Sequence, residues 1–166
     1  MALIDGLLQE LDQETVTTRR VLERVPDNRL AWRPHEKART LGELALHVAM
    51  VPGGVAELVA SPSPAQAPQF TDPSPKSASE LIPALQQSIA RAKQVLGSMD
   101  DATLLATWRL MKDERELVAL PRVAMLRSVM LNHWYHHRGQ LTVYLRELGV
   151  PIPSIYGPSA DENPFA

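Results

Sequence analysis

Proline and helix-like apolar spacing together constrain how this chain can fold. Four segments, residues 2–24, 41–60, 78–97 and 121–148, carry apolar residues mostly three or four positions apart. That spacing places side chains on one face of an α-helix. Prolines bound or interrupt these segments, and five of the fourteen prolines lie within residues 61–76. The pattern predicts four amphipathic helices and therefore an all-α chain folded as a four-helix bundle.

Local signals mark the start and the middle of the second helix. Thr40 is a suitable N-cap, and Glu43 three residues later completes a capping box. Pro52 removes one backbone hydrogen bond and clashes with the carbonyl of Val48, so we expect a kink or a break at residues 51–54. In the loop before this helix, Trp32 is expected to pack on the bundle.

The sequences of the segments between and after the helices predict different amounts of regular structure. Residues 61–76 are expected to form a long irregular connection between the second and third helices. Residues 98–120 favour a short helix and a strand-like piece. Pro121 suits the first turn of the fourth helix, and Gly149 its end. The tail, residues 151–166, is too rich in proline and glycine for regular structure, and a chain of 166 residues predicts one domain spanning 1–166.

Composition excludes several classes of protein. The chain has no cysteine, which excludes disulfides, thiolate nucleophiles and cysteine-based zinc sites, and fits a reducing compartment. A net charge of -2 without a Lys/Arg-rich run argues against a nucleic-acid partner. The first residues do not resemble a signal peptide, and no unbroken apolar run approaches the roughly 18 residues of a membrane span. We therefore expect a cytoplasmic protein with no membrane partner.

Three of the five histidines fall within "NHWYHHRGQ", residues 132–140. At about 100° per residue, His133 and His137 lie on the apolar stripe of the fourth helix, whereas His136 points toward an edge. His47 lies on or beside the apolar stripe of the second helix. Two helices are therefore expected to present imidazoles to one interior, where helical bundles build their metal sites.

The spacing of these histidines suits a divalent transition metal. Positions i and i+4 lie about 5–6 Å apart at Cβ, close enough for His133 and His137 to converge on one ion. His47 is the candidate third ligand. Three histidines leave a position for water or substrate, which is typical of a catalytic site. The alternative is that the three imidazoles are hydrogen-bonded core residues.

The sequence argues against a zinc peptidase and offers only weaker candidates for residues that support the metal site. Trp134 occupies the general-base position of H-E-x-x-H, which argues against a zinc peptidase. Candidates for orienting a ligand or closing the site are Glu43, Gln140 and Tyr156. Glu43 is equally explained by capping, and Tyr156 by anchoring the tail. Arg138 is expected at the surface or against the tail, His35 is expected to be exposed, and His136 is expected to make a structural hydrogen bond.

Two stretches resemble the DinB-like family of metal-binding helical bundles. These are "WRPHEKARTLGELALHVAMVPG" and "HWYHHRGQLTVYLRELGVPIPSIYGPSADE". The resemblance implies an up-down-down-up bundle with a long crossover between helices two and three. It also implies a metal triad at His47, His133 and His137, binding zinc or nickel.

The same resemblance implies an activity, since characterised relatives include metal-dependent thiol S-transferases and thiol-dependent isomerases. The expected partners are thus a small-molecule thiol and an electrophile. Two alternatives stay open. One is a non-catalytic bundle that binds a metal or a small ligand, and the other is a metal-free structural dimer. A symmetric homodimer is compatible with a chain of this size, and no residue pattern selects it.

Overall fold

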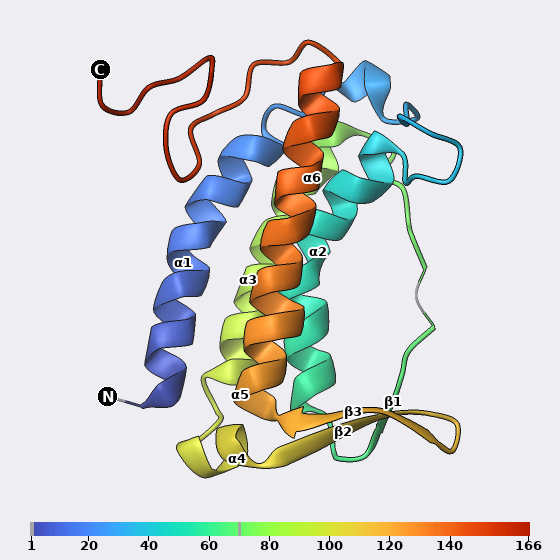
Figure 1. The fold of residues 1–166 in the computed structure, drawn as a ribbon, viewed down its shortest axis with the longest axis vertical. Helices are drawn as coiled ribbons and strands as arrows, with labels where there is room; N and C mark the ends of the chain where they lie inside the picture. Colours follow the sequence, from blue (N-terminus) through green and yellow to red (C-terminus); the bar gives the residue numbers. More distant parts are fainter. Residues whose placement is uncertain (1, 70) are drawn as a thin grey trace.

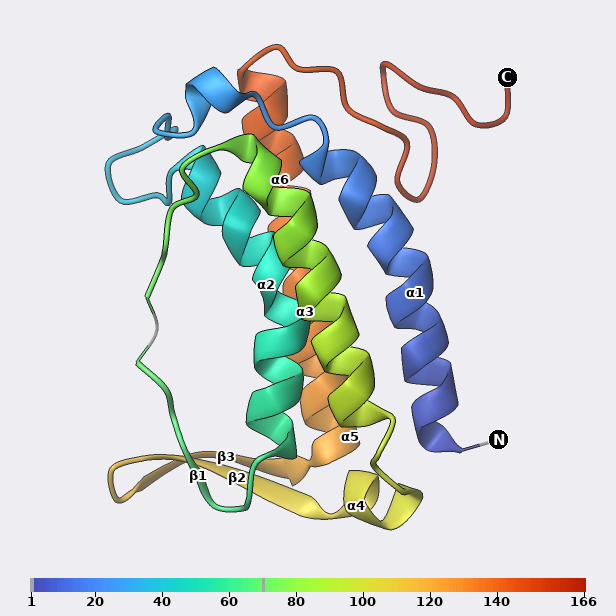
Figure 2. The same ribbon diagram turned by 180° about the vertical axis from the view of Figure 1, so that it is seen from behind.

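The computed structural model describes residues 2–69 and 71–166. Its long helices are α1 (Leu3–Leu22), α2 (Leu41–Ala60), α3 (Leu81–Leu96) and a continuous rod made of α5 (Arg122–Met125), the π-helical segment Leu126–Asn132 and α6 (His133–Glu147). They lie side by side, and α1 and the rod run in one direction while α2 and α3 run in the other (Figures 1 and 2). The four predicted helical segments are therefore confirmed, with small shifts at their ends.

The chain is mostly helical, but the expectation of an all-α chain holds only in part, because a small sheet lies at one end of the helices (Figure 1). Its strands are β1 (Ala65–Gln66), β2 (Thr107–Lys112) and β3 (Arg115–Pro121). β1 pairs parallel to β2, and β2 pairs antiparallel to β3. The short helix α4 (Asp101–Leu105) precedes β2, as expected for residues 98–120. β1 has no sequence signal because it is two residues long and lies in the proline-rich segment.

The proline-rich segment is a crossover. Because α2 and α3 run in the same direction, the chain must return along the outside of the molecule between them (Figures 1 and 2). Side chains from the sheet end bind the free carbonyls where α2 stops. Trp108 Nε1 donates to the carbonyl of Ser61 at 3.2 Å, and Arg122 donates to the carbonyls of Val59 and Ser61 at 3.0 and 3.2 Å. These bonds fix the carboxyl end of α2, whose last carbonyls have no partner inside the helix.

Pro52 bends α2 without breaking it, since the helix is continuous from Leu41 to Ala60 and changes direction near its middle (Figures 1 and 2). The carbonyl of Val48, left free by Pro52, accepts a 2.8 Å hydrogen bond from Trp134 Nε1 on α6. Close by, a Cβ on Gly53 would fall 2.8 Å from the carbonyl oxygen of Ser88 on α3, so glycine is required there. The bend is thus enclosed by two neighbouring helices.

The chain leaves α6 through a left-handed glycine and then packs back on the helices. Gly149 has φ 72°, and the amide of Val150 donates to the carbonyl of Leu145 at 2.9 Å, the pairing of a Schellman motif. The irregular tail is held by Arg20, which donates to the carbonyl of Ser154 at 3.0 Å. The prediction of an irregular tail over 151–166 is confirmed, and the tail packs on the helices.

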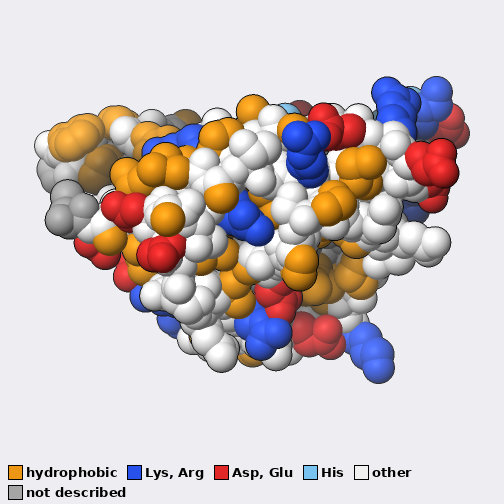
Figure 3. Space-filling view, turned by 90° about the horizontal axis from the view of Figure 1, so that it is seen from below, with side chains coloured by type: hydrophobic (Ala, Val, Ile, Leu, Met, Phe, Trp, Pro, Cys, Tyr) orange, Lys and Arg blue, Asp and Glu red, His pale blue; other side chains and the backbone are white. Residues whose placement is uncertain are grey.

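Over the described residues, α2 is the one helix long and apolar enough to cross a membrane by length and composition, but half of that stretch is buried inside the protein, as expected of a core helix. Seen from the sheet end, acidic, basic and apolar side chains alternate across the surface instead of gathering by type (Figure 3).

Candidate metal centre

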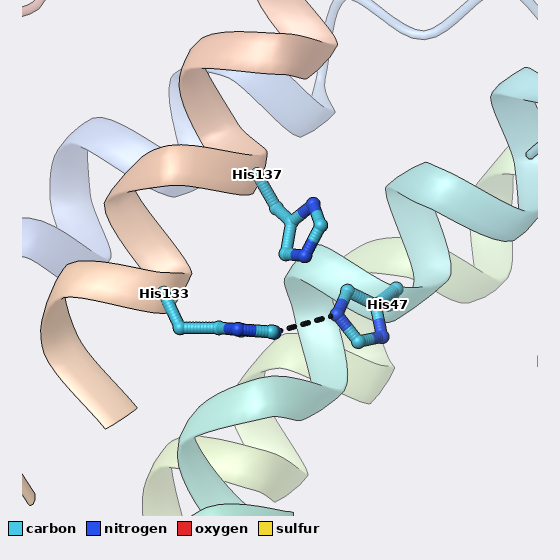
Figure 4. A group of neighbouring side chains, drawn as sticks. All are labelled: His47, His133 and His137. Atoms are coloured by element: carbon cyan, nitrogen blue, oxygen red, sulfur yellow. Dashed lines mark hydrogen bonds between the residues drawn. The ribbon is translucent and has the colours of Figure 1, made fainter. Parts of the chain in front are cut away.

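The three predicted ligands come together between α2 and α6. His47 lies in the second turn of α2, His133 is the first residue of α6, and His137 is one turn further on. Their side chains point toward one another across the gap between the two helices (Figure 4). The placement follows from the sequence spacing, because residues four apart share one face of a helix.

The rings are close enough to share one ion. His47 Nε2 and His133 Nε2 are 3.1 Å apart. The ring centroids of His137 lie 4.6 Å from His47 and 4.4 Å from His133. One nitrogen from each ring can be chosen so that all three lie within 4.8 Å of one another. These three histidines could therefore hold a metal ion.

The donor set fits a tetrahedral transition metal. Two nitrogens bound at 2.0–2.1 Å to one tetrahedral ion lie about 3.3–3.4 Å apart, close to the observed His47–His133 separation. His47 and His133 are half-buried, and His137 is buried. Two of the three imidazoles are therefore partly exposed to solvent.

The surroundings keep these imidazoles neutral, which is the form that binds metal. Burial lowers the pKa of His47 to about 4, and the positive charge of Arg39 acts in the same direction. Burial likewise lowers the pKa of His133 to about 4, with a further contribution from His137. Burial also lowers the pKa of His137. Protons therefore compete weakly for this site at neutral pH.

Gln140 orients one of the ligands. Its Oε1 accepts a 2.9 Å hydrogen bond from Nδ1 of His137. A proton held on Nδ1 leaves the lone pair of Nε2 free for a metal, the arrangement commonly seen around ligating histidines. Of the three residues predicted to orient a ligand or close the site, Gln140 is thus placed directly against the triad.

The other two candidates have different contacts. Glu43 accepts a 2.7 Å hydrogen bond from the amide of Thr40 and so completes the capping box of α2. The hydroxyl of Tyr156 is hydrogen-bonded to Glu14 at 2.9 Å and to Arg138. These contacts match the capping and tail-anchoring interpretations.

Arg138 is buried and not at the surface, which corrects one half of the expectation. It pairs with Glu14 at 2.6 Å and donates to Thr18 Oγ1 at 3.0 Å, while its bond to Tyr156 confirms the contact with the tail. The sequence misses this burial because Arg138 faces α1, on a different side of α6 from the histidine stripe. His35 and His136 are both exposed, and the ring centroid of His136 lies 4.9 Å from that of His137.

Two features of the site were not predicted. Trp134 is fully buried and hydrogen-bonded to α2, whereas its place in the sequence indicated only that the H-E-x-x-H motif of zinc peptidases is absent here. Arg39 carries a positive charge that depresses the pKa of all three histidines, and it pairs with Asp72 of the crossover at 2.7 Å. Neither role follows from helix periodicity, since Trp134 bonds to a carbonyl 86 positions away, and Arg39 precedes α2 and pairs with a residue of an irregular segment.

Comparisons with known proteins agree with this fold. The sequence profile of the DinB family matches residues 2–164. The uncharacterised protein YrdA of Bacillus subtilis is 28% identical over 162 residues, covering 96% of this chain and 91% of YrdA. A DinB-like protein of Bacillus cereus superposes with a TM-score of 0.70 at 25% identity, over 92% of this chain and 97% of the other. The DinB-like protein YjoA of Bacillus subtilis shares the fold at 19% identity, with a TM-score of 0.64 over 88% and 96% of the two chains.

Proposed function

Since this chain belongs to the DinB family, we propose that it is a metal-dependent enzyme of the thiol S-transferase or thiol-dependent isomerase kind. His47, His133 and His137 are the proposed ligands of one divalent transition metal, zinc or nickel. The proposed substrates are a small-molecule thiol and an electrophile.

One observation carries the proposal. Among the described residues, the group of candidate ligands consists of three histidines that approach within 4.8 Å, and two of them are half-exposed. A structural zinc site is closed by four protein ligands, whereas a catalytic site keeps a position for water or substrate. Three imidazoles, two of them half-exposed, therefore favour chemistry over a purely structural role.

The residues of the chain have distinct tasks in this proposal. His47 and His133 stay neutral at physiological pH because burial lowers the pKa of each to about 4. Gln140 holds the Nδ1 proton of His137, so that Nε2 faces the other two rings. Arg39, which pairs with Asp72, lies beside the triad, and its charge lowers the pKa of all three histidines. When bound, a divalent ion would lower the pKa of a thiol at the open position and so supply a nucleophile near neutral pH.

We also propose that the family's up-down-down-up four-helix bundle describes the helical part of this chain. The directions of α1, α2, α3 and α6, and the crossover between α2 and α3, support this description (Figures 1 and 2). The sheet is then an addition at one end of the bundle.

The test begins with the metal. Protein prepared without a histidine tag is analysed by inductively coupled plasma mass spectrometry, beside His47→Ala and His133→Ala. We expect about one equivalent of a divalent metal in the wild type, lost in both variants because two imidazoles hold a metal far more weakly than three. His35→Ala is the matched control, since His35 is exposed and lies outside the triad.

Activity is then measured with a panel of low-molecular-weight thiols and a chromogenic electrophile. We expect thiol transfer or isomerisation that disappears in His47→Ala and persists in His35→Ala. Metal binding without turnover of any thiol and electrophile pair would favour the non-catalytic metal-binding alternative. A wild type without metal would remove the basis of the proposal.

A further inference from the structure

The structure assigns Trp134 as the residue that positions α2 and α6 so that His47 and His133 meet. This inference rests on the proposed metal site and concerns how the chain builds it. Trp134 touches neither a proposed substrate nor a proposed ligand nitrogen through its hydrogen bond. It acts through the backbone of α2.

Pro52 lies inside α2. Within a helix, the amide of residue 52 would bind the carbonyl of Val48, but proline has no amide hydrogen. A buried carbonyl without a partner is costly, so this group requires another donor. The indole Nε1 of Trp134 supplies it at 2.8 Å, and both groups are shielded from water.

The position of this bond in the sequence gives it a second consequence. Val48 follows His47 directly on α2, and Trp134 follows His133 directly on α6. The bond therefore joins the two helices one residue away from each ligand. A helical residue has little freedom relative to its neighbour, so fixing Val48 against Trp134 fixes the separation of the two imidazoles. Those imidazoles lie with Nε2 atoms 3.1 Å apart.

On the side that faces α3, the bend at Pro52 is also held by a side-chain hydrogen bond. Ser88 Oγ of α3 accepts a 2.8 Å hydrogen bond from the amide of Gly53 and donates to the carbonyl of Met50 at 3.1 Å. Ser88 thus fixes the bend against α3, whereas Trp134 fixes it against the helix that carries two ligands. The indole is the contact that bears on the metal site.

Trp108 provides a matched control. Like Trp134, it is fully buried, and its Nε1 donates to a backbone carbonyl of the α2 region, that of Ser61 at 3.2 Å. It lies on β2 at the sheet end, away from the triad. Replacement of either tryptophan by phenylalanine removes an indole and a hydrogen bond, but only Trp134→Phe removes the bond between the ligand-bearing helices.

The experiment measures zinc affinity by competition with a chromogenic chelator, together with thermal stability. We expect Trp134→Phe to weaken zinc binding by roughly 10–100-fold, the usual effect of losing a contact that supports a ligand. Trp108→Phe should lower the melting temperature similarly and change zinc affinity less than twofold. Equal losses of affinity in the two variants, or no loss in Trp134→Phe, would overturn the inference.

The variant Pro52→Ala tests the same hydrogen bond independently. Its new backbone amide can bind the carbonyl of Val48, so the indole of Trp134 is no longer the required donor and the interhelical bond is weakened from the other side. The double variant Pro52→Ala/Trp134→Phe should therefore bind zinc with the same affinity as whichever single variant binds zinc less tightly. Losses that simply multiply would show that the two residues act separately, against the inference.

A readout on metal-free protein separates this inference from the proposed function. The ring centroids of His47 and His133 are 5.3 Å apart, close enough for nuclear Overhauser effects between ring protons. These effects should be present in the wild type and in Trp108→Phe, and lost in Trp134→Phe. If the wild type binds no zinc while this pattern holds, the proposed function fails and the positioning role stands. If the effects persist in Trp134→Phe, the positioning role fails.

Discussion

Replacing Glu14 by alanine should destabilise this protein far more than an ordinary surface substitution. Glu14 on α1 pairs with Arg138 on α6 at 2.6 Å, and the two side chains are 14% and 2% exposed. Removing one partner of a buried ion pair costs about 3–5 kcal/mol, because the remaining charge stays buried. The hydroxyl of Thr18, 3.0 Å from the guanidinium, still accepts a hydrogen bond, so we expect a loss of about 3 kcal/mol.

Thermal and urea unfolding followed by circular dichroism measure this loss. For a chain of this length, 1 kcal/mol shifts the melting temperature by about 2–4 °C, so a fall of roughly 6–12 °C is expected. The effect should persist at high salt, because buried pairs are screened much less than exposed ones.

A matched control lies at the carboxyl end of the same helix. Arg19 and Glu23 form an ion pair at 2.8 Å, but their side chains are 51% and 47% exposed. Glu23→Ala should cost less than about 1 kcal/mol, since exposed pairs contribute little. If the losses of stability in Glu14→Ala and Glu23→Ala are equal, burial does not determine the strength of these pairs and the reasoning is refuted.

Three further predictions concern the metal site and its supporting helix. The lowered pKa values of His47 and His133, about 4 each, mean that the unfolded chain binds more protons than the folded one between pH 4 and about 6.5. Metal-free protein should therefore lose stability as the pH falls from 6.5 toward 4, by about 1–2 kcal/mol for each histidine after allowing for solvent screening, and urea unfolding at pH 7 and pH 5 checks this. Gln140→Leu removes the acceptor from Nδ1 of His137 and should weaken metal binding about 10-fold or more, as measured by chelator competition. Thr40→Ala removes the N-cap of α2 and should cost about 1 kcal/mol of unfolding free energy in urea, with unchanged metal stoichiometry.

The site residues whose placement follows from helix periodicity were predictable from the sequence. The apolar spacing located the helices, and the separation of His133 and His137 by four residues placed both imidazoles on one face of α6. His47 followed from the second stripe in the same way. Thr40 and Glu43 were identified as a capping box because that motif is local to one turn.

Contacts between distant segments were not predictable. The sequence showed that Pro52 would leave the carbonyl of Val48 without its usual donor, but not that Trp134 fills it, because the two residues are 86 positions apart. Arg138 was expected at the surface or the tail because its angle on α6 departs from the histidine stripe, and the burial depends on Glu14 and Thr18 of α1.

The sequence by itself determined which residues are helical and which histidines share a face, because helix periodicity is a property of neighbouring residues. Tertiary structure decided the 3.1 Å approach of His47 to His133 and the neutral state of both imidazoles, since each depends on how α2 packs against α6. It also decided the small sheet. Two residues of β1 acquire a strand conformation only because β2, more than forty positions later, lies beside them.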